Sequence, residues 1–580
     1  MLCTVTLQRL RTASSAFAAF LLIGNAYAAV ETADSEALRE RTKLEALERE
    51  RLQQQPSVNL QSGSRSSLET QGIPESETPC FTIQRFSLDI PSQLSSEAKR
   101  QGASALPLDT FFFAQDYLEQ YKGRCIGHGG INYLIQNLTT QILARGYSTT
   151  RIGITEQNLA NGTLKLTLVP GLIHELRFAD AATAGTWKNA FPTASGKLLN
   201  LRDLEQGLEQ MKRVPSQEVD MQIVPAGSIG ESDIVISVKR GKPWKVVATL
   251  DDTGAKGTGK YQAGLQFAWD NPFGANDLFN IGLNADADRN SYQRGTQGNN
   301  LSYSIPFGYL TASVSAGEST YHQRIQGAVT SFVSSGRSQN FEAKLNYLFH
   351  RDQFSKTSLQ FRTTKRWSHS YIDDTEVAVQ KRNTTHAELA LIHKHNIGQA
   401  QLDITFAYRW GAPWFGAQAE VANAANGRYR YGIETLDTTL SIPFKIKDRP
   451  LSYSATMRAQ NTNTVLYASE WFSIGNRWTV RGFDGEYSLG AEKGFFLRNE
   501  LAYPIPNTEQ SAYVGFDYGK VYGDNVINLP GDHLAGCVIG MRGALLRGLS
   551  YEVFAGTPIN KPQSYRSENP ALGFSLMYQM

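Results

Sequence analysis

The sequence has few charged residues and no long apolar stretch beyond its N-terminus. Charged residues make up 19% of the 580 residues and the formal net charge is only +3, so composition gives no reason to expect a nucleic-acid partner. No later segment approaches the roughly eighteen consecutive apolar residues that a membrane-spanning helix needs, and the mean hydropathy is −0.34. If this chain crosses a membrane, it must do so with strands closed into a barrel.

Cysteines are also scarce, and only four occur in the chain. The N-terminus has the pattern of a secretory signal, and export would place the chain where disulfides form. Because Cys3 lies in that signal, Cys80 and Cys125 can pair, which leaves Cys537 single. Cys537 alternates with apolar residues in a strand-like run, so we interpret it as a lipid-facing or packed apolar side chain.

The signal itself covers residues 1–28. Two arginines precede an apolar stretch over residues 13–24, and Ala26-Tyr27-Ala28 provides the small-residue pattern of a cleavage site. We therefore expect cleavage between Ala28 and Ala29. The alternative, an anchoring helix, is disfavoured because the apolar stretch is only about twelve residues long.

Residues 29–55 predict a helix that carries charges on nearly all sides. Its apolar stripe is thin, and Pro56 ends it. Such a helix is poorly suited to a protein core but would suit a water-filled pore; the alternative is a solvated helix or a short coiled coil. Residues 56–79 are rich in Ser, Gly, Pro and Gln without periodicity, which predicts a flexible linker.

Two small α+β units follow, over residues 80–170 and 171–241. In the first, the pattern predicts one strand, two helices and two further strands; the predicted ranges are 81–90, 108–122, 131–142, 148–155 and 163–169. The second unit repeats this order more briefly, with a strand over 173–178, a helix over 200–211 and strands over 219–223 and 234–238.

From residue 242 to residue 580 only strand patterns occur. Apolar and aromatic residues alternate with polar ones, as in Tyr261, Ala263, Leu265, Phe267 and Trp269. Apolar residues on one face, polar residues on the other and aromatic residues near the ends of the runs are typical of a transmembrane barrel. A soluble sandwich would alternate too, but would carry fewer aromatic residues at its rims.

One glycine-rich stretch between these strands, Thr479-Val480-Arg481-Gly482-Phe483, is too polar for a strand and too aromatic for an idle linker. About thirty residues later, Gly515-Phe516-Asp517-Tyr518-Gly519 places a carboxylate on the strand face opposite to its aromatic neighbours. If those neighbours face lipid, Asp517 faces the lumen, where it is a natural acceptor for a bidentate guanidinium group. The alternative is that Val480 to Phe483 form an ordinary turn.

This pair of motifs resembles the signatures of two-partner secretion transporters, called TpsB, of the POTRA-plus-barrel superfamily. The runs from Arg145 to Arg151 and from Asn200 to Gln206 resemble the first and second POTRA domains of that family. The resemblance implies a transmembrane antiparallel β-barrel of sixteen strands over residues 242–580; periodicity alone would also allow fourteen or eighteen. It further implies two periplasmic α+β POTRA domains and an N-terminal plug helix.

For the motif residues, the resemblance implies that a loop around residues 471–495 folds into the barrel. Its residues Val480, Arg481, Gly482 and Phe483 would form a latch in which Arg481 meets Asp517. The function implied is secretion, across the bacterial outer membrane, of an exoprotein that carries an N-terminal two-partner secretion domain. The POTRA domains of this chain, in the periplasm, would recognise that secretion domain. The exoprotein would be a haemolysin, an adhesin or a contact-dependent inhibition toxin.

Further expectations are a monomer, contact with outer-membrane lipid, and help from the barrel assembly machinery during biogenesis. The alternating apolar C-terminal strand suits that machinery, although it ends in Met580 and not in the usual Phe. The alternative function is a factor that assembles or inserts other barrels, where more POTRA domains and no plug helix are expected. A plain diffusion porin needs neither the POTRA pair nor the charged helix.

Two chemical motifs are set aside. Residues 254–260 imitate a phosphate-binding loop, but Tyr261 replaces the Ser or Thr that would hold Mg²⁺, and no helix follows. His393 and His395 can share a strand face but have no third ligand at a suitable spacing. No nucleophile with a base can be assembled from short motifs, so we expect no enzyme activity, no metal and no cofactor.

Overall fold

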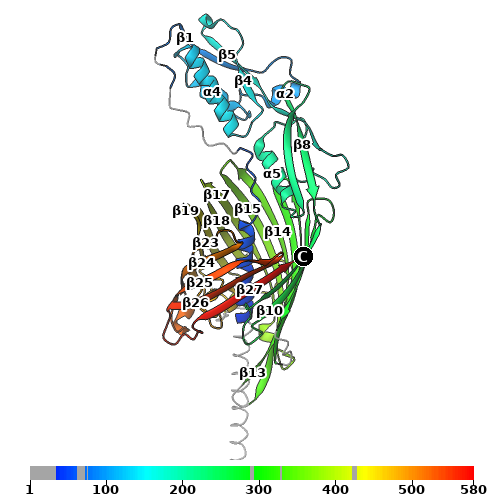
Figure 1. Cartoon of the computed structure of the whole chain (residues 1–580), viewed down its shortest axis with the longest axis vertical. Helices are drawn as coiled ribbons and strands as arrows, with labels where there is room; N and C mark the ends of the chain where they lie inside the picture. Colours follow the sequence, from blue (N-terminus) through cyan, green and yellow to red (C-terminus); the bar gives the residue numbers. More distant parts are fainter. Residues whose placement is uncertain (1–33, 62–71, 75, 288–292, 327–329, 421–426) are drawn as a thin grey trace, which may run out of the picture.

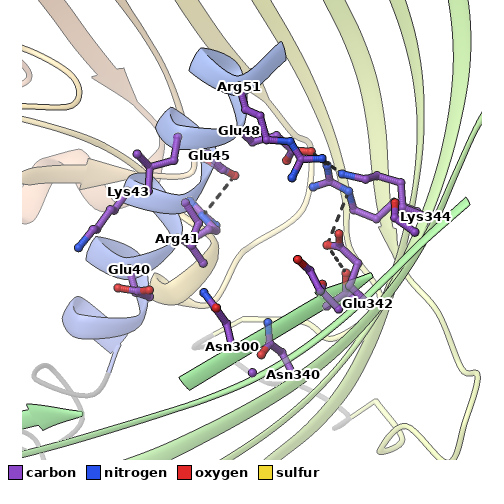
Figure 2. Close-up of a pocket in the computed structure, with 18 of the residues that line it drawn as sticks. Glu40, Arg41, Lys43, Glu45, Glu48, Arg51, Asn300, Asn340, Glu342 and Lys344 are labelled. Atoms are coloured by element: carbon purple, nitrogen blue, oxygen red, sulfur yellow. Dashed lines mark hydrogen bonds and ion pairs between the residues drawn. The ribbon is translucent and has the colours of Figure 1, made fainter. Parts of the chain in front are cut away.

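The computed structural model describes residues 34–61, 72–74, 76–287, 293–326, 330–420 and 427–580. The expected signal peptide, with Ala28 and Ala29, lies outside the described residues. Two α+β domains and a barrel follow one another along the long axis of the molecule (Figure 1), and a helix over residues 34–53 lies inside the barrel (Figures 1 and 2). Among the described residues, no helix has both the length and the apolar character that crossing a membrane requires.

Sixteen antiparallel strands close the barrel, which confirms the expected fold class. The last strand pairs with the first, from Ser575 opposite Asp251 to Gln579 opposite Val247. A two-residue strand, β16 (Thr375–Glu376), forms a short antiparallel hairpin with the last two residues of β15 and is not counted among the sixteen. The barrel strands are β9 (Trp244–Asp251), β10 (Gln262–Asp270), β11 (Leu278–Asp286), β12 (Arg294–Phe307), β13 (Leu310–Gln326), β14 (Ser331–Arg351), β15 (Ser355–Ile372), β17 (Arg382–Ile397), β18 (Ala400–Gly411), β19 (Gly432–Ile446), β20 (Arg449–Asn461), β23 (Lys493–Pro504), β24 (Gln510–Tyr522), β25 (His533–Leu546), β26 (Leu549–Asn560) and β27 (Ala571–Gln579).

The inside and outside of the barrel follow the alternation in the sequence. On β24, Val514 and Phe516 are about half exposed on the outer face, whereas Asp517 is fully buried on the inner face. Cys537 on β25 shares the outer face with Ile539, which is 62% exposed. Residues 252–261, which imitate a phosphate-binding loop, connect β9 with β10.

The first POTRA domain has shorter and more numerous helices and strands than its sequence pattern predicts. The predicted strand over 81–90 divides into two, because its first part pairs with a strand that begins at Cys125, and Cys80 forms a disulfide with that cysteine. The predicted strand over 148–155 shortens to three residues, and a short helix that the pattern did not indicate appears. The elements are β1 (Cys80–Thr82), β2 (Arg85–Asp89), α2 (Ser96–Gln101), α3 (Phe112–Glu119), β3 (Cys125–Gly127), α4 (His128–Ala144), β4 (Arg151–Gly153), the 3-10 turn η1 (Leu159–Asn161) and β5 (Thr163–Val169).

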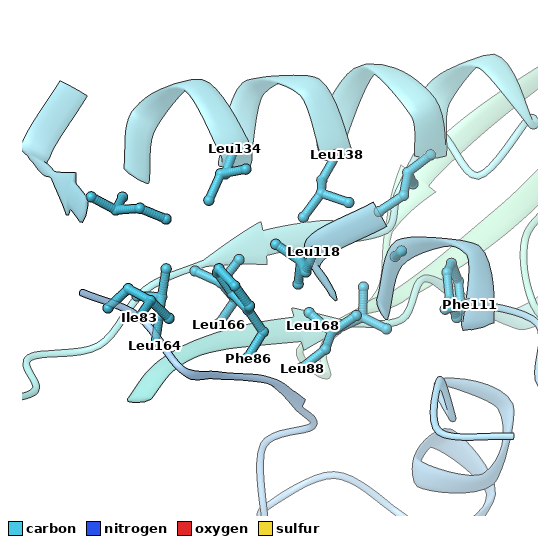
Figure 3. Packing of buried hydrophobic residues seen from close by; sticks show 13 residues of the cluster. Ile83, Phe86, Leu88, Phe111, Leu118, Leu134, Leu138, Leu164, Leu166 and Leu168 are labelled. Carbon is cyan, nitrogen blue, oxygen red and sulfur yellow. The ribbon is translucent and has the colours of Figure 1, made fainter. Parts of the chain in front are cut away.

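Apolar packing of α3 and α4 on the sheet holds this domain together (Figure 3). Leu134, Leu138 and Ile142 recur at helical spacing on α4, and at most 1% of each side chain is exposed. They pack against alternate residues of β5, among them Leu166. The helical spacing read from the sequence therefore marks the face of α4 that is buried.

The second POTRA domain consists of β6 (Leu172–Phe178), α5 (Leu201–Lys212), β7 (Gln217–Pro225) and β8 (Glu231–Arg240). The Asn200 side chain caps α5 by accepting a hydrogen bond from the Arg202 main-chain N–H. Leu204 and Leu208 on α5 face the sheet and are buried. The opposite, polar face of α5 touches the barrel.

This polar face fixes the second POTRA domain to the turns at the near end of the barrel. Gln206 and Gln210 both donate to the Gly308 carbonyl oxygen, at 3.1 and 3.0 Å. The Arg351 guanidinium group at the end of β14 pairs with Glu205 and Glu209, at 3.2 and 2.8 Å. The domain is therefore held close to the mouth of the lumen.

Within residues 56–79, where a flexible linker is expected, several described residues make specific contacts. Residues 57–61 lie against α5 and the barrel, and Glu77 accepts hydrogen bonds from the main chain of Gly127 and Gly130 at 2.6 and 3.1 Å. These contacts leave no periodic signal in the sequence, because each of them involves a main-chain group, which every residue carries.

We expect the disulfide to stabilise the first POTRA domain by about 4 kcal/mol, because it closes a loop of 45 residues. Replacing Cys80 and Cys125 by Ser should therefore speed hydrogen exchange in α4, measured by mass spectrometry on the full-length protein. Cys537→Ser is the matched control and should leave that exchange unchanged. Equal exchange in all three proteins would contradict this estimate.

Candidate functional site: the helix and loop inside the barrel

Charged groups of the barrel wall hold the N-terminal helix (residues 34–53) in the lumen (Figure 2). Asp34 pairs with Arg382 at 2.7 Å, and Glu45 with Arg458 at 3.0 Å. Further along, the Glu48 carboxylate accepts from Lys344 at 2.9 Å and from Arg362. Arg49 of the helix also forms an ion pair with Asp437 of the barrel wall, at 3.3 Å.

Apolar contacts hold the helix much less. Leu44 and Leu47 are 47% and 42% exposed, and both line a cavity of about 1130 Å³ between helix and wall. Leu38, by contrast, is buried. A helix retained by ion pairs and hydrogen bonds can leave without exposing a large apolar surface, because water replaces those bonds outside.

The second occupant of the lumen is the connection between β20 and β23, over residues 462–492. It contains a small hairpin of β21 (Phe472–Ile474) and β22 (Leu489–Ala491). Val480 and Phe483 belong to an apolar cluster that joins this loop to the inner face of the barrel; its buried members are Phe472, Ile474, Val480, Phe483, Leu489, Ala491, Phe496, Val521, Leu534 and Tyr565.

Arg481, in this loop, forms an ion pair with Asp517 on β24. Arg481 Nε donates to Asp517 Oδ2 at 2.8 Å, Nη2 donates to Oδ1 at 3.0 Å, and the Arg481 main-chain N–H donates to Oδ2 at 2.9 Å. A second carboxylate, Glu500, accepts from Arg481 Nη1 at 2.6 Å. Arg481 is 4% exposed and Asp517 fully buried, so neither charge can lose its partner without a large desolvation cost.

Glycines of the wall make room for this approach. A Cβ atom at Gly536 would lie 2.0 Å from the Arg481 carbonyl oxygen, and one at Gly515 would lie 2.5 Å from Arg481 Nη2. At Gly556 the nearest atom would be Gly482 Cα, 2.7 Å away. A larger residue at Gly536 or Gly556 would meet the backbone of the loop, and one at Gly515 would displace the Arg481 guanidinium group.

Sequence reasoning missed Glu500, Gly536 and Gly556 as partners of the motif. A glycine inside a strand pattern often marks the close approach of another backbone, and Gly536 and Gly556 both lie within strands. That signal was present. Nothing in the local sequence distinguishes Glu500 from the other polar residues of the inner face.

Helix and loop also touch each other. Arg39 donates to the Gly485 carbonyl oxygen at 2.9 Å, and Arg41 pairs with Glu470 at 3.0 Å and donates to the Trp471 carbonyl oxygen. The loop is held to the wall by an apolar core and a buried ion pair, while the helix is held to the loop by polar contacts. The helix is therefore the part of this assembly that is easier to remove.

We expect Gly482→Ala to loosen the loop, because Gly482 has φ +106° and a Cβ atom there would lie 2.7 Å from the Thr557 carbonyl oxygen. Gly490→Ala is the matched control in the same loop, since a Cβ atom at Gly490 meets nothing nearer than 3.4 Å. Trypsin cleavage after Arg481, followed by mass spectrometry, should be at least tenfold faster in Gly482→Ala only. Equal cleavage of the two variants would contradict the steric account.

Comparison with known proteins agrees with this geometry. The model of the haemolysin secretion/activation protein family ShlB/FhaC/HecB matches residues 230–543, a POTRA domain of ShlB type matches residues 96–171, and a further POTRA domain matches residues 172–225.

Individual relatives match over nearly their whole length. The outer membrane transporter CdiB-2 of Burkholderia pseudomallei is 45% identical over 543 residues, which cover 92% of this chain and 93% of that protein. The solved structure of CdiB from Acinetobacter baumannii is 26% identical, with a TM-score of 0.83 over 94% of this chain and 98% of the other. CdiB from Escherichia coli, at 24% identity, shares the fold with a TM-score of 0.81 over 94% and 99%.

A family model covers more than half of the chain, two POTRA matches precede it, and a relative is 45% identical over 92% of the chain. The chain therefore belongs to the haemolysin secretion/activation protein family ShlB/FhaC/HecB.

Proposed function

We propose that this chain secretes one large exoprotein across the outer membrane by two-partner secretion. The exoprotein is of the haemolysin, adhesin or contact-dependent inhibition toxin type, and its N-terminal secretion domain docks on the POTRA domains in the periplasm. The observation that carries the proposal is a polar helix inside the lumen, which ion pairs hold to the barrel wall. A permanent closure would use apolar packing, and an open porin would have no such helix.

In this proposal the helix acts as a plug and the inward loop as a fixed latch. Docking of the partner releases the plug, and the unfolded partner then moves through the lumen and folds outside. The sequence offers no site for a nucleotide, so the driving force is the folding of the partner at the cell surface, which opposes its return. The proposal assigns no catalytic step, metal or cofactor to the chain.

The latch consists of Val480, Arg481, Gly482 and Phe483 on the loop and Asp517 on the wall. Arg481 keeps the loop at one depth in the lumen, and the apolar side chains beside it keep water away from the ion pair. The signal cleavage between Ala28 and Ala29 belongs to the same proposal, as do a monomeric state, outer-membrane lipid around the barrel and the barrel assembly machinery during biogenesis.

Family membership supports secretion over the alternative, the assembly of other barrels. Relatives of the chain are described as outer membrane transporters, and the one of Serratia marcescens as a haemolysin transporter, 28% identical over 69% of this chain.

Co-expression with the large exported protein encoded beside this chain tests the proposal. The exported protein should appear in the medium only when both are present. Arg481→Ala should lower its amount at least tenfold while the barrel still inserts, because Asp517 is left buried without its partner at a cost of about 3–5 kcal/mol. Arg547→Ala, at an exposed turn, is the matched control.

Absence of the exported protein from the medium with the unaltered chain would contradict secretion of that partner. Normal secretion by Arg481→Ala, with the unaltered chain active, would contradict the latch alone. Loss of other barrels from the outer membrane when this chain is deleted, with no effect on secretion, would favour the assembly alternative.

A further inference from the structure

Residues 57–61 occupy a cleft between α5 and the turn that joins β14 to β15. Four side chains form its walls, Glu205 and Glu209 on α5 and Arg351 and Gln353 at the turn, and we call them the main-chain clamp. The segment follows directly after the lumen helix, so it is the first part of the chain on the POTRA side of the barrel (Figure 1).

The clamp binds the backbone of this segment. Glu209 accepts a hydrogen bond from the Val58 main-chain N–H at 2.6 Å, and Glu205 accepts from that of Leu60 at 2.9 Å. Arg351 Nη2 donates to the Val58 carbonyl oxygen at 2.7 Å, and Gln353 Nε2 donates to that of Gln61 at 2.8 Å. The two bound N–H groups belong to alternate residues, which point to the same side of an extended chain, and the chain bends at Leu60 before the bound Gln61 carbonyl.

Side chains of the segment also make contacts: Gln61 donates to the Leu143 carbonyl oxygen at 3.1 Å and accepts from Arg202, and the Ser57 hydroxyl accepts from Lys356 at 3.3 Å. Leu60 is 37% exposed and Asn59 is exposed as well, although the Asn59 amide donates to the Gln353 carbonyl oxygen at 3.0 Å. Val58 is partly buried against the core of the second POTRA domain. Every residue except proline carries the main-chain N–H and C=O groups that the clamp binds, so this main-chain part of the recognition tolerates many sequences.

The clamp is held in place by its own ion pairs. The side chains of Arg351 and Glu205 are 2% and 1% exposed, and they pair at 3.2 Å. Burial alone would raise the pKa of the Glu209 carboxyl, but hydrogen bonds and charge from Arg351 and Lys356 outweigh it and hold that pKa below its ordinary value. Glu209 therefore remains a charged acceptor, whichever chain lies in the cleft.

The cleft opens into the lumen. Glu209 and Lys356 line the same cavity as residues 53–56, which lead from the last residue of the lumen helix to the segment in the clamp. A polypeptide that enters the barrel from the POTRA side and takes the place of the helix therefore passes the clamp. An unfolded chain on this path presents main-chain N–H and C=O groups without partners, which are the groups that the clamp binds.

We propose that the main-chain clamp is a sequence-tolerant binding site for extended polypeptide, which holds residues 57–61 while the helix fills the lumen and the exported polypeptide after the helix has left. The second half of this proposal rests on the proposed secretion function; the first half does not. The two chains compete for one site, so entry of the exported chain and release of the helix are coupled.

The first test measures peptide binding to the full-length protein in detergent micelles. The probe is a fluorescein-labelled peptide with the sequence of residues 56–61, followed by fluorescence anisotropy. In the chain, Val58→Pro with Leu60→Pro removes both main-chain donors and vacates the clamp, while Val58→Ala with Leu60→Ala keeps them. We expect the peptide to bind the double-proline variant at least tenfold more tightly than the double-alanine variant.

Two further peptides separate main-chain from side-chain recognition. A scrambled peptide without a change in composition should bind the double-proline variant within threefold of the original, and a peptide with Pro in place of Val58 and Leu60 should not bind. Absence of binding by the original peptide would overturn the site. Binding by the original and not by the scrambled peptide would overturn its sequence tolerance.

The second test places a benzophenone amino acid at Phe354, next to Gln353, in cells that secrete the exported protein. Illumination should give an adduct between this chain and the exported protein. Peptide binding with normal secretion but no adduct would overturn the competition. Loss of secretion by the unaltered chain would instead count against the proposed function, since the peptide assay needs no secretion.

Discussion

The arrangement of this protein depends on the pairing of charges inside a closed barrel. The inner face carries Arg362, Arg382, Arg409 and Arg458, and the helix and the inward loop bring carboxylates to them. Charges removed from bulk water are costly unless they are paired and hydrogen-bonded. The lumen therefore favours one position of the helix, in which positive and negative groups lie opposite each other.

Helix and loop fill the same lumen by different physical means. The loop combines an apolar cluster with the Arg481 and Asp517 pair, and its glycine neighbours leave no space for movement. The helix leaves two leucines in a water-accessible cavity and depends on polar contacts. Water can substitute for polar contacts far better than for apolar packing, so the structure joins a fixed element to a removable one.

Strand alternation and glycine patterns made much of this predictable from sequence. The two-residue period separated outward-facing Phe516 from lumen-facing Asp517, and it also marked the barrel as a whole. The residues alone indicated Asp517 as an acceptor for a guanidinium group, and the resemblance of the two motifs to those of two-partner secretion transporters implied that Arg481 is its partner. Local sequence patterns were sufficient to predict the strands of the barrel, because the alternation of inward and outward residues repeats along every strand.

Contacts between distant segments were beyond local patterns. No property of Glu48 identifies Lys344 or Arg362 as its partners, since many carboxylates and cations along the chain are equivalent in sequence. The docking of residues 57–61 was missed for a different reason, because main-chain hydrogen bonds leave no trace in composition. The division of the first strand followed from the pairing of β1 with β3, a contact between segments about 45 residues apart.

The most direct measurement of the central claim is the conductance of single barrels in planar lipid bilayers for the unaltered chain, Glu48→Lys and Glu50→Lys. Glu48 accepts from Lys344 and Arg362, whereas Glu50 on the same helix is exposed and bonds to Gln54. If ion pairs keep the helix in the lumen, Glu48→Lys raises the fraction of time spent in a high-conductance state severalfold, and Glu50→Lys behaves like the unaltered chain. The same conductance in all three proteins would contradict the claim.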